Sequence, residues 1–203
     1  MESLRIIGAG GHGKVVADVA VAMGYTDVSF LDDCYPNRTR HGVWSICGKP
    51  NLHETITNRF CAVGANATRE QLFHTYDLRK SPVLKHPFSS ISPSAQLGNG
   101  TLIAAGSVVN ADAWVGQGVI LNTGCSVDHD CLLGDFVHLS PGACLAGNVR
   151  IGNRTWIGLG AVIREGIVVG SDVTVAAGAV VIQDIPNNSV VGGVPARPLK
   201  LRK

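Results

Sequence analysis

The chain has 203 residues, enough for one large domain or two small ones. Hydrophobic residues make up 45% and charged residues 16%, a balance that predicts a large buried core. The net charge of +2 is too small to indicate nucleic acid or an anionic membrane as a partner, and no window predicts a membrane span. Because no signal peptide is predicted and the six cysteines are scattered like reduced thiols, we expect a cytoplasmic protein.

Residues 1–86 have the pattern of a small Rossmann-like α/β domain. Buried strands are predicted at 4–7, 28–31 and 60–63, with helices at 14–23 and 68–76 and a last extended segment at 81–84. Strands that alternate with helices predict a parallel sheet with right-handed crossovers. We assign no helix or strand to the polar stretch around Pro36, Asn37 and Gly42.

A glycine-rich turn, Gly8 to Gly13, lies between the first strand and the first helix. Its spacing, with Asp32 about twenty residues on, matches the dinucleotide fingerprint and taken alone would indicate NAD. The domain is only half of a dinucleotide fold, so we favour a nucleotide sugar whose diphosphate meets backbone N–H groups at the helix N-terminus. Asp32 and Asp33 would then accept hydrogen bonds from a base or ribose. A turn that only lets strand and helix pack closely, with no role for His12, remains the alternative.

Residues 91–186 follow a six-residue repeat. An aliphatic residue stands at every sixth position from Ile91 to Val181, and a small or β-branched residue follows it by four places. These two positions face the same side of a short strand, whereas the Gly, Asn and Asp between them suit corners. Three hexads make a triangular coil, and coils stacked about 4.8 Å apart give a prism about 25 Å long. The repeat therefore predicts an all-β solenoid with an aliphatic interior, followed by a C-terminal tail at 187–203.

The repeat contains two histidines. His129 is predicted on an outward corner between Asp128 and Asp130, either of which could orient the imidazole and raise its basicity. Gly147 is predicted one coil above, where its N–H could hold an acyl carbonyl while His129 takes a proton from the attacking group. A solvated corner histidine is the alternative for His129. His138 is predicted to point outward from a strand, either as a cofactor or interface contact or as an ordinary surface histidine.

The outward strand positions of the repeat are unusually apolar. They include Leu102, Val108, Trp114, Ile120, Leu132, Trp156, Val162, Val168 and Val180. Contiguous apolar surface of this kind marks interfaces. Since Leu102, Ile120, His138 and Trp156 are spaced to share one wall, we expect a homo-oligomer that buries this wall, with active sites between neighbouring prisms.

The chain resembles the sialic-acid O-acetyltransferase/nucleotide-amino-sugar N-acetyltransferase group of hexapeptide-repeat enzymes. The closest resemblance is to the bacterial UDP-4-amino-sugar N-acetyltransferases of bacillosamine synthesis. The matching stretches are Gly8-Ala9-Gly10-Gly11-His12-Gly13, Phe30-Leu31-Asp32-Asp33, Ile91-Ser92-Pro93-Ser94-Ala95, Gly118-Val119-Ile120-Leu121-Asn122-Thr123, Ala146-Gly147-Asn148-Val149 and Gly193-Val194-Pro195-Ala196-Arg197. The resemblance implies a left-handed parallel β-helix, a homotrimer, acetyl-CoA as co-substrate and a nucleotide-linked amino sugar as acceptor.

The resemblance also implies roles for single residues. His129 would be the general base, tuned by Asp130 where the family usually has a longer Glu, so that Asp128 is a second candidate for this role. Contacts with acetyl-CoA are implied for His138, Gly147, Leu159 and Ala177. Contacts with the nucleotide sugar are implied for Gly10, Gly11, His12, Asp32, Asp33 and Gly64.

The predicted reaction is direct acetyl transfer to the 4-amino group of a UDP-, dTDP- or GDP-linked 4-amino-4,6-dideoxyhexose, for surface glycan or glycoprotein synthesis. It needs no acyl-enzyme and no metal. A sugar O-acetyltransferase of the sialic-acid type would need the same base and remains an alternative, as does a non-catalytic sugar-binding scaffold. A zinc hydrolase would need three converging histidines, and the repeat supplies only His129 and His138.

Overall fold

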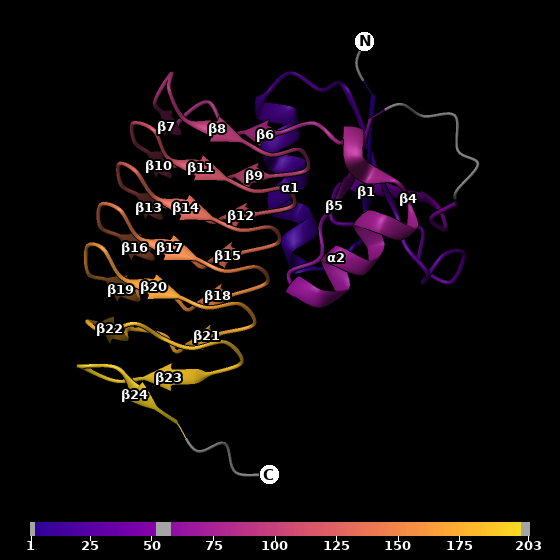
Figure 1. The fold of residues 1–203 in the computed structure, drawn as a ribbon. Helices are drawn as coiled ribbons and strands as arrows, with labels where there is room; N and C mark the ends of the chain where they lie inside the picture. Colours follow the sequence, from indigo (N-terminus) through magenta and orange to yellow (C-terminus); the bar gives the residue numbers. More distant parts are fainter. Residues whose placement is uncertain (1–2, 52–57, 200–203) are drawn as a thin grey trace.

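The computed structural model describes residues 3–51 and 58–199, and Figure 1 shows an α/β domain beside a tall stack of coils. The N-terminal elements are β1 (Ser3–Ile7), α1 (Gly11–Ala22), β2 (Asp27–Leu31), β3 (Arg40–His41), β4 (Trp44–Gly48), β5 (Arg59–Cys61), α2 (Asn66–Thr75) and the 3-10 helix η1 (Leu78–Lys80). The sheet order is β3-β4-β2-β1-β5, in which β1, β2, β4 and β5 run parallel and β3 pairs antiparallel with β4.

Two features of this domain differ from the prediction. A short hairpin, β3–β4, occupies the stretch to which no element was assigned, because Gly42 adopts a φ of 63° in a two-residue turn. The extended segment predicted at 81–84 does not join the N-terminal sheet. Instead β6 (Leu84–Lys85) pairs with β9 (Leu102–Ile103) of the repeat region, so the coils begin upstream of Ile91.

The repeat region forms a parallel β-helix with three walls, which we name after one residue in each. The His138 wall contains β6, β9, β12 (Ile120–Leu121), β15 (His138–Leu139), β18 (Trp156–Ile157), β21 (Thr174–Val175), β23 (Val190–Gly192) and the antiparallel β24 (Arg197–Pro198). The Cys144 wall contains β7 (Ser90–Ile91), β10 (Val108–Val109), β13 (Ser126–Val127), β16 (Cys144–Leu145), β19 (Val162–Ile163) and β22 (Val180–Val181). The Trp114 wall contains β8 (Gln96–Leu97), β11 (Trp114–Val115), β14 (Leu132–Leu133), β17 (Arg150–Ile151) and β20 (Val168–Val169).

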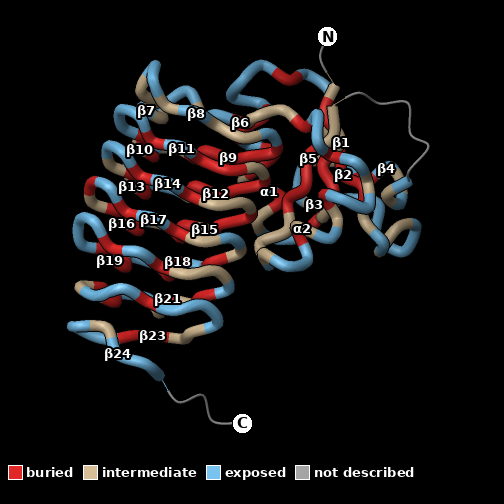
Figure 2. Tube along the Cα trace, in the orientation of Figure 1, coloured by how far each residue is buried: buried red, intermediate tan, exposed pale blue. Residues whose placement is uncertain are grey.

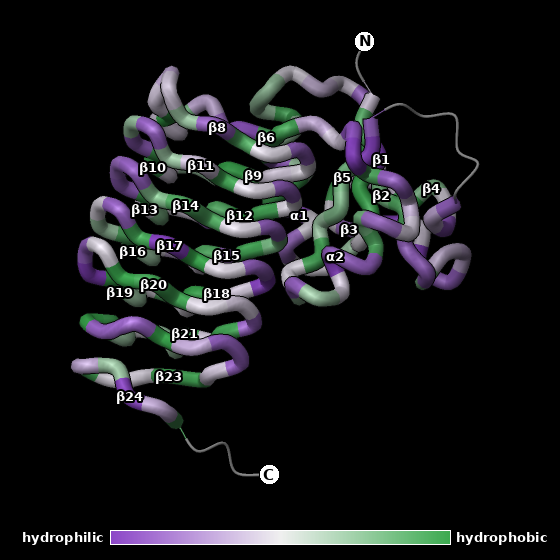
Figure 3. Tube along the Cα trace, viewed as in Figure 1, coloured by the Kyte–Doolittle hydropathy of each residue, from purple (hydrophilic) through white to green (hydrophobic). Residues whose placement is uncertain are grey.

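The predicted eighteen-residue coil is confirmed by the strand register. Ile120 pairs with His138, and His138 pairs with Trp156 on the next coil. Inward residues such as Val127 and Leu145 are fully or almost fully buried in one continuous aliphatic core. Figure 3 shows the resulting alternation of hydrophobic strands and hydrophilic corners along the stack. The expected C-terminal tail contributes β23, which adds a parallel strand to the His138 wall.

The upper part of the His138 wall is covered by the chain's own N-terminal domain. Leu102 and Ile120 are only 0% and 2% exposed, and they share a hydrophobic cluster with Val16 and Ala20 of α1. Figure 2 shows buried residues where β9 and β12 face α1. The expectation that a second copy buries Leu102 and Ile120 is therefore wrong, because the apolar face of α1 already packs there.

Apolar residues on the other walls remain open in the single chain. Trp114, Leu132 and Val168 are exposed on the Trp114 wall, and Val162 is exposed on the Cys144 wall. Within residues 3–51 and 58–199, neither α-helix is long and apolar enough to cross a bilayer.

Candidate active site

His129 stands on the corner that joins the Cys144 wall to the Trp114 wall. The corner turns at Asp130, whose φ of 59° lies in the left-handed region that Asp tolerates better than most side chains. The Asp128 carboxylate accepts hydrogen bonds from the His129 backbone N–H at 2.8 Å and from Asn110 Nδ2 at 2.8 Å. These bonds fix the backbone, so the His129 side chain projects from the prism with 60% of its surface exposed.

The two flanking carboxylates act on the imidazole in different ways. Asp130 Oδ2 lies 2.7 Å from His129 Nδ1, so the shorter side chain still reaches the ring. Because a carboxylate only accepts hydrogen bonds, Nδ1 carries the proton and Nε2 is left as the basic nitrogen. The hydrogen bond that His129 donates to Asp130, followed by the charge of Asp128, raises the pKa of His129. The arrangement is that of an oriented base with its free nitrogen facing outward.

Gly147 lies one coil above His129, as the spacing predicts. A Cβ built on Gly147 would stand 2.6 Å from both Cε1 and Nε2 of His129, so a larger residue would push the ring out of this position. The Asn148 N–H donates to the His129 carbonyl at 2.9 Å and fixes the stacking of the two corners. Within the described residues, the Gly147 N–H donates to no acceptor. A basic nitrogen and a free backbone donor thus share one corner.

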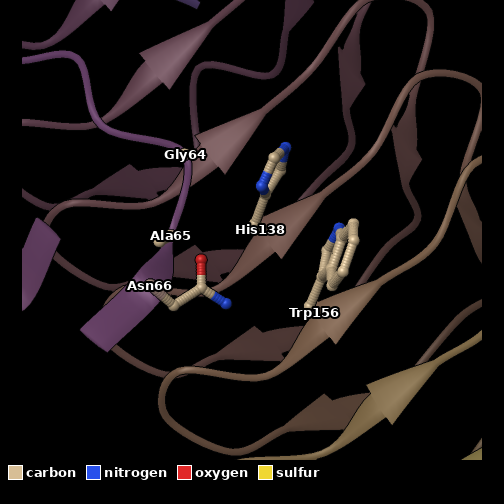
Figure 4. A pocket seen from close by; sticks show the side chains of 5 residues that line it. All are labelled: Gly64, Ala65, Asn66, His138 and Trp156. Carbon is tan, nitrogen blue, oxygen red and sulfur yellow. The ribbon is translucent and has the colours of Figure 1, made fainter. Parts of the chain in front are cut away.

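A separate pocket lies between the His138 wall and the N-terminal domain (Figure 4). It has a volume of about 380 Å³ and is lined by Gly64, Ala65, Asn66, His138 and Trp156. The His138 and Trp156 rings stack at 26°, with their centroids 6.3 Å apart. Trp156 is held in place because its Nε1–H donates to Ser140 Oγ at 2.7 Å, yet it is still 48% exposed.

Hydrogen bonds define the protonation of His138. Asn122 Oδ1 accepts the Thr123 N–H at 2.9 Å, which turns the Asn122 amide nitrogen towards His138 Nε2 at 3.3 Å. Nε2 is therefore an acceptor, the proton sits on Nδ1, and the ring also hydrogen-bonds the Gly64 backbone. Burial, then the charges of Arg69 and His12, lowers the pKa of His138 to about 3, so the ring is neutral. Only its ring surface is left for a ligand.

His12 lies at the junction of the two domains and not in the turn where the sequence analysis expects it. Helix α1 begins at Gly11, so His12 is on its first turn, and its ring centroid is 6.2 Å from that of His138. Among the described residues its Nε2 is a buried polar atom without a partner. Burial, then the charge of Arg69, lowers the pKa of His12 to about 4.

The glycine turn is held by side chains from β2 and the hairpin. Asp32 accepts the Ala9 N–H at 2.7 Å and the Cys34 N–H at 3.0 Å, so both of its oxygens already stabilise backbone, while Asp33 is exposed. Gly13 permits close packing, because a Cβ there would lie 2.6 Å from the Gly8 oxygen. Gly10 and Gly11 are exposed at the N-terminus of α1.

Two further side chains, for which the sequence makes no prediction, also reach this turn. Arg38 Nη2 donates to the Ala9 oxygen at 2.7 Å, and His41 Nε2 lies 2.8 Å from the Gly10 oxygen. His41 lies on the β3–β4 hairpin. The one sequence signal for this hairpin is Gly42, which stands at its turn.

On the corner that joins the His138 wall to the Cys144 wall, each coil has a glycine at the same position. Glycines with positive φ repeat there at Gly106, Gly124, Gly142, Gly160 and Gly178. Leu159 and Ala177 occupy this corner, and among the described residues their N–H groups donate to no acceptor. This corner offers unpaired amides to an extended ligand.

In a single chain, these features do not converge. The His129 corner joins the Cys144 and Trp114 walls, so it is the corner opposite the His138 wall. The N-terminal domain, which carries the glycine turn, His12 and Gly64, covers the upper part of the His138 wall. His129 and Gly147 therefore lie on the far side of the prism from the pocket. No cluster of three His, Cys, Asp or Glu side chains suited to a metal ion is found in the part of the chain that is described.

Comparisons with known proteins match both parts of the chain. Residues 3–76 match the PglD N-terminal domain, and residues 148–183 match the bacterial transferase hexapeptide (six repeats). A curated relative, UDP-N-acetylbacillosamine N-acetyltransferase of Bacillus subtilis (strain 168), is 37% identical over 114 residues. That match spans about half of each sequence, 52% of this chain and 52% of the relative.

Solved structures match over almost the whole chain. The acetyltransferase domain of PglB from Neisseria gonorrhoeae FA1090, in complex with acetyl coenzyme A, is 44% identical with a TM-score of 0.92, covering 98% of this chain and 99% of that one. A variant of perosamine N-acetyltransferase from Caulobacter crescentus, in complex with CoA and GDP-perosamine, is 38% identical with a TM-score of 0.91, covering 98% of both chains. The chain therefore belongs to the family of N-acetyltransferases that join a PglD-type N-terminal domain to a left-handed β-helix of hexapeptide repeats.

Proposed function

We propose that the chain transfers the acetyl group of acetyl-CoA to the amino group of a nucleotide-linked amino sugar, specifically the 4-amino group of a 4-amino-4,6-dideoxyhexose. The observation that carries this proposal is the His129 corner, where Asp130 holds Nδ1 and, among the described residues, neither Nε2 nor the Gly147 N–H has a hydrogen-bond partner. Similarity to proteins named for amino-sugar acetylation supports both the reaction and the acceptor class. A role in surface glycan or glycoprotein synthesis follows from such an acceptor.

In the proposed mechanism, His129 Nε2 accepts a proton from the sugar amine as its nitrogen attacks the thioester carbon. The Gly147 N–H donates to the carbonyl oxygen and stabilises the negative charge that develops on it. The new N–C bond forms, the C–S bond breaks, and the proton held by His129 passes to the departing sulfur of CoA. Asp130 keeps the imidazole in the required tautomer and stabilises the imidazolium that forms transiently.

We place the acetyl-CoA between neighbouring copies in a homotrimer. The proposal rests on the position of His129 opposite the His138 wall, which keeps it away from any sugar held by its own N-terminal domain. On the corner between the His138 wall and the Cys144 wall, the backbone N–H groups of Leu159 and Ala177 donate to the amide oxygens of the pantetheine arm. The ring surface of His138 and the exposed Trp156 then meet the thioester end, and the next copy brings His129 and Gly147.

The N-terminal domain is proposed to hold the nucleotide sugar. Gly10 and Gly11 are exposed at the α1 N-terminus, where backbone N–H groups suit a diphosphate, and Arg38 adds positive charge next to them. Asp33 is free to meet a base or ribose, whereas Asp32 acts by holding the turn. His12 and Gly64 connect this site to the pocket beside His138. The six free cysteines suit a reducing compartment, and we propose the cytoplasm.

The experiment that tests this function measures thiol release from acetyl-CoA with UDP-, dTDP- and GDP-linked 4-amino sugars. The product is then analysed by mass spectrometry before and after mild alkali, which cleaves an O-acetyl ester but leaves an amide. We expect an alkali-stable acetyl group on the sugar nitrogen. An alkali-labile product would favour O-acetylation, and no turnover of any acceptor despite sugar binding would favour a non-catalytic scaffold.

A further inference from the structure

Arg69, on α2, is the largest fully buried side chain among the residues that the structure describes, at 1% exposed. Within residues 3–51 and 58–199, no carboxylate forms an ion pair with it. Its guanidinium instead donates to oxygens from both domains. The acceptors are the Gly118 oxygen at 2.7 Å, the Phe136 oxygen at 2.7 Å, the Val63 and Gly64 oxygens at 3.0 Å each, and Asn66 Oδ1 at 2.8 Å.

This hydrogen-bond set needs the shape of arginine. Nε and Nη2 bind carbonyls on the β-helix, while Nη1 binds the two carbonyls that follow β5. A planar fork with five donors can serve both groups at once, whereas a lysine ammonium has three donors at one point. Burying a cation without a counterion is unfavourable, and apolar side chains of similar size often stabilise a fold as well or better. The apolar neighbours Phe73 and Phe136 show that such packing is available here.

We propose that Arg69 is a positioning residue, which sets segment 63–66 against the β-helix and so fixes the shape of the pocket beside His138. This inference rests on the function proposed above. Segment 63–66 contributes Gly64, Ala65 and Asn66 to the pocket, and Arg69 bonds two of these three residues directly. The opposite side of the pocket comes from His138 and Trp156 on the β-helix. One guanidinium therefore spans the two halves of the ligand site.

Gly64 links Arg69 to the ring that meets the ligand. Its backbone accepts from Arg69 Nη1 and also hydrogen-bonds His138. Displacing segment 63–66 would therefore change the lining of the pocket and, at the same time, break the hydrogen bond between Gly64 and His138. Burial, together with the charge of Arg69, also lowers the pKa values of His12 and His138, so both rings beside the pocket are neutral.

The test compares Arg69→Lys with Glu70→Gln, a matched control on the same helix. Glu70 pairs across the same domain interface with Arg154 Nη1 at 3.2 Å, and among the described residues its side chain forms no hydrogen bond with Gly64, Ala65 or Asn66. Hydrogen–deuterium exchange of the full-length protein measures whether segment 63–66 opens, independently of any activity. Steady-state kinetics with a nucleotide-linked 4-amino sugar then separate KM from kcat.

For Arg69→Lys we expect faster exchange at 63–66 than in either wild type or Glu70→Gln. Its KM for the nucleotide sugar should rise about tenfold, with a smaller change in kcat. The reason is that ligand binding must re-order segment 63–66, at a free-energy cost equal to about one lost hydrogen bond to a charged group. Equal exchange and equal KM in the two variants would overturn the proposal. If wild type turns over no amino sugar, the proposed function fails, while the exchange comparison still decides the role of Arg69. Should Arg69→Lys not fold, Arg69→Gln with the same two readouts replaces it, and unchanged exchange there would count equally against the proposal.

Discussion

His129 and Gly147 occupy the same corner on successive coils, so closely that a Cβ on residue 147 would stand 2.6 Å from His129 Nε2. The ring is held on its other side by Asp130 at 2.7 Å. In this position the free nitrogen of the base lies beside a backbone N–H that, among the described residues, donates to no acceptor.

Gly147→Ala should lower kcat by ~100-fold, because the added methyl displaces the imidazole from the position in which proton transfer is aligned. The backbone N–H remains, and the side chain that must give way, His129, is exposed, so thermal stability should change little. Glu165→Ala, one coil further along the same corner, is the control and should retain wild-type kcat. A Gly147→Ala enzyme with unchanged kcat would show that the ring position does not matter.

Asp130→Asn should shift the pH–rate profile. Asp130 raises the pKa of His129, and the base works only when unprotonated, so the acid limb lies at the raised pKa. Replacing the carboxylate with a neutral amide lowers that pKa, so the acid limb should move to lower pH. The plateau should fall about tenfold or more, since the base becomes weaker and its tautomer is no longer fixed.

Asp128→Asn separates charge from ring contact. Asp128 bonds the His129 backbone and Asn110, but not the imidazole. Its effect on the acid limb should therefore have the same direction as that of Asp130→Asn and a smaller size. A larger shift for Asp128→Asn than for Asp130→Asn would assign the tuning role to Asp128.

Mixing two inactive variants should restore activity if sites form between copies. His129→Ala disables one side of the proposed site, and Trp156→Arg blocks the pocket on the other side. After the subunits are mixed in equal amounts and allowed to exchange, random assembly should place two intact halves together in about a quarter of the sites. Light scattering checks that the mixture has the mass of the wild-type oligomer. Activity no higher than that of the separate variants would mean that each chain supplies a whole site.

The repeat made much of this geometry predictable, because a fixed register leaves little freedom. Once coils of eighteen residues stack, His129 must lie below Gly147, and His138 must pair with Trp156. What covers an outward wall does not follow from the period. Leu102 and Ile120 look like an intersubunit patch in the sequence, yet α1 of the same chain buries them.

Other parts of the site had weak or no signals in the sequence. Arg69 stands in a polar stretch of α2 and resembles a solvated helix residue, although it is fully buried by carbonyls from distant segments. Its role depends on tertiary contacts between residues 69, 118 and 136, for which no local pattern exists. The β3–β4 hairpin was similarly hidden, because its strands are short and its turn holds only Gly42 and Val43.

The most direct measurement of the central claim is the rate of acetyl transfer to a nucleotide-linked 4-amino sugar by wild type and by His129→Ala. His129→Ala should lose ~1,000-fold in kcat, a loss within the range for a general base, while still binding acetyl-CoA and the sugar nucleotide in calorimetry. The wild-type enzyme should release one thiol for each N-acetylated sugar formed. A His129→Ala enzyme that transfers acetyl groups at the wild-type rate would contradict the account.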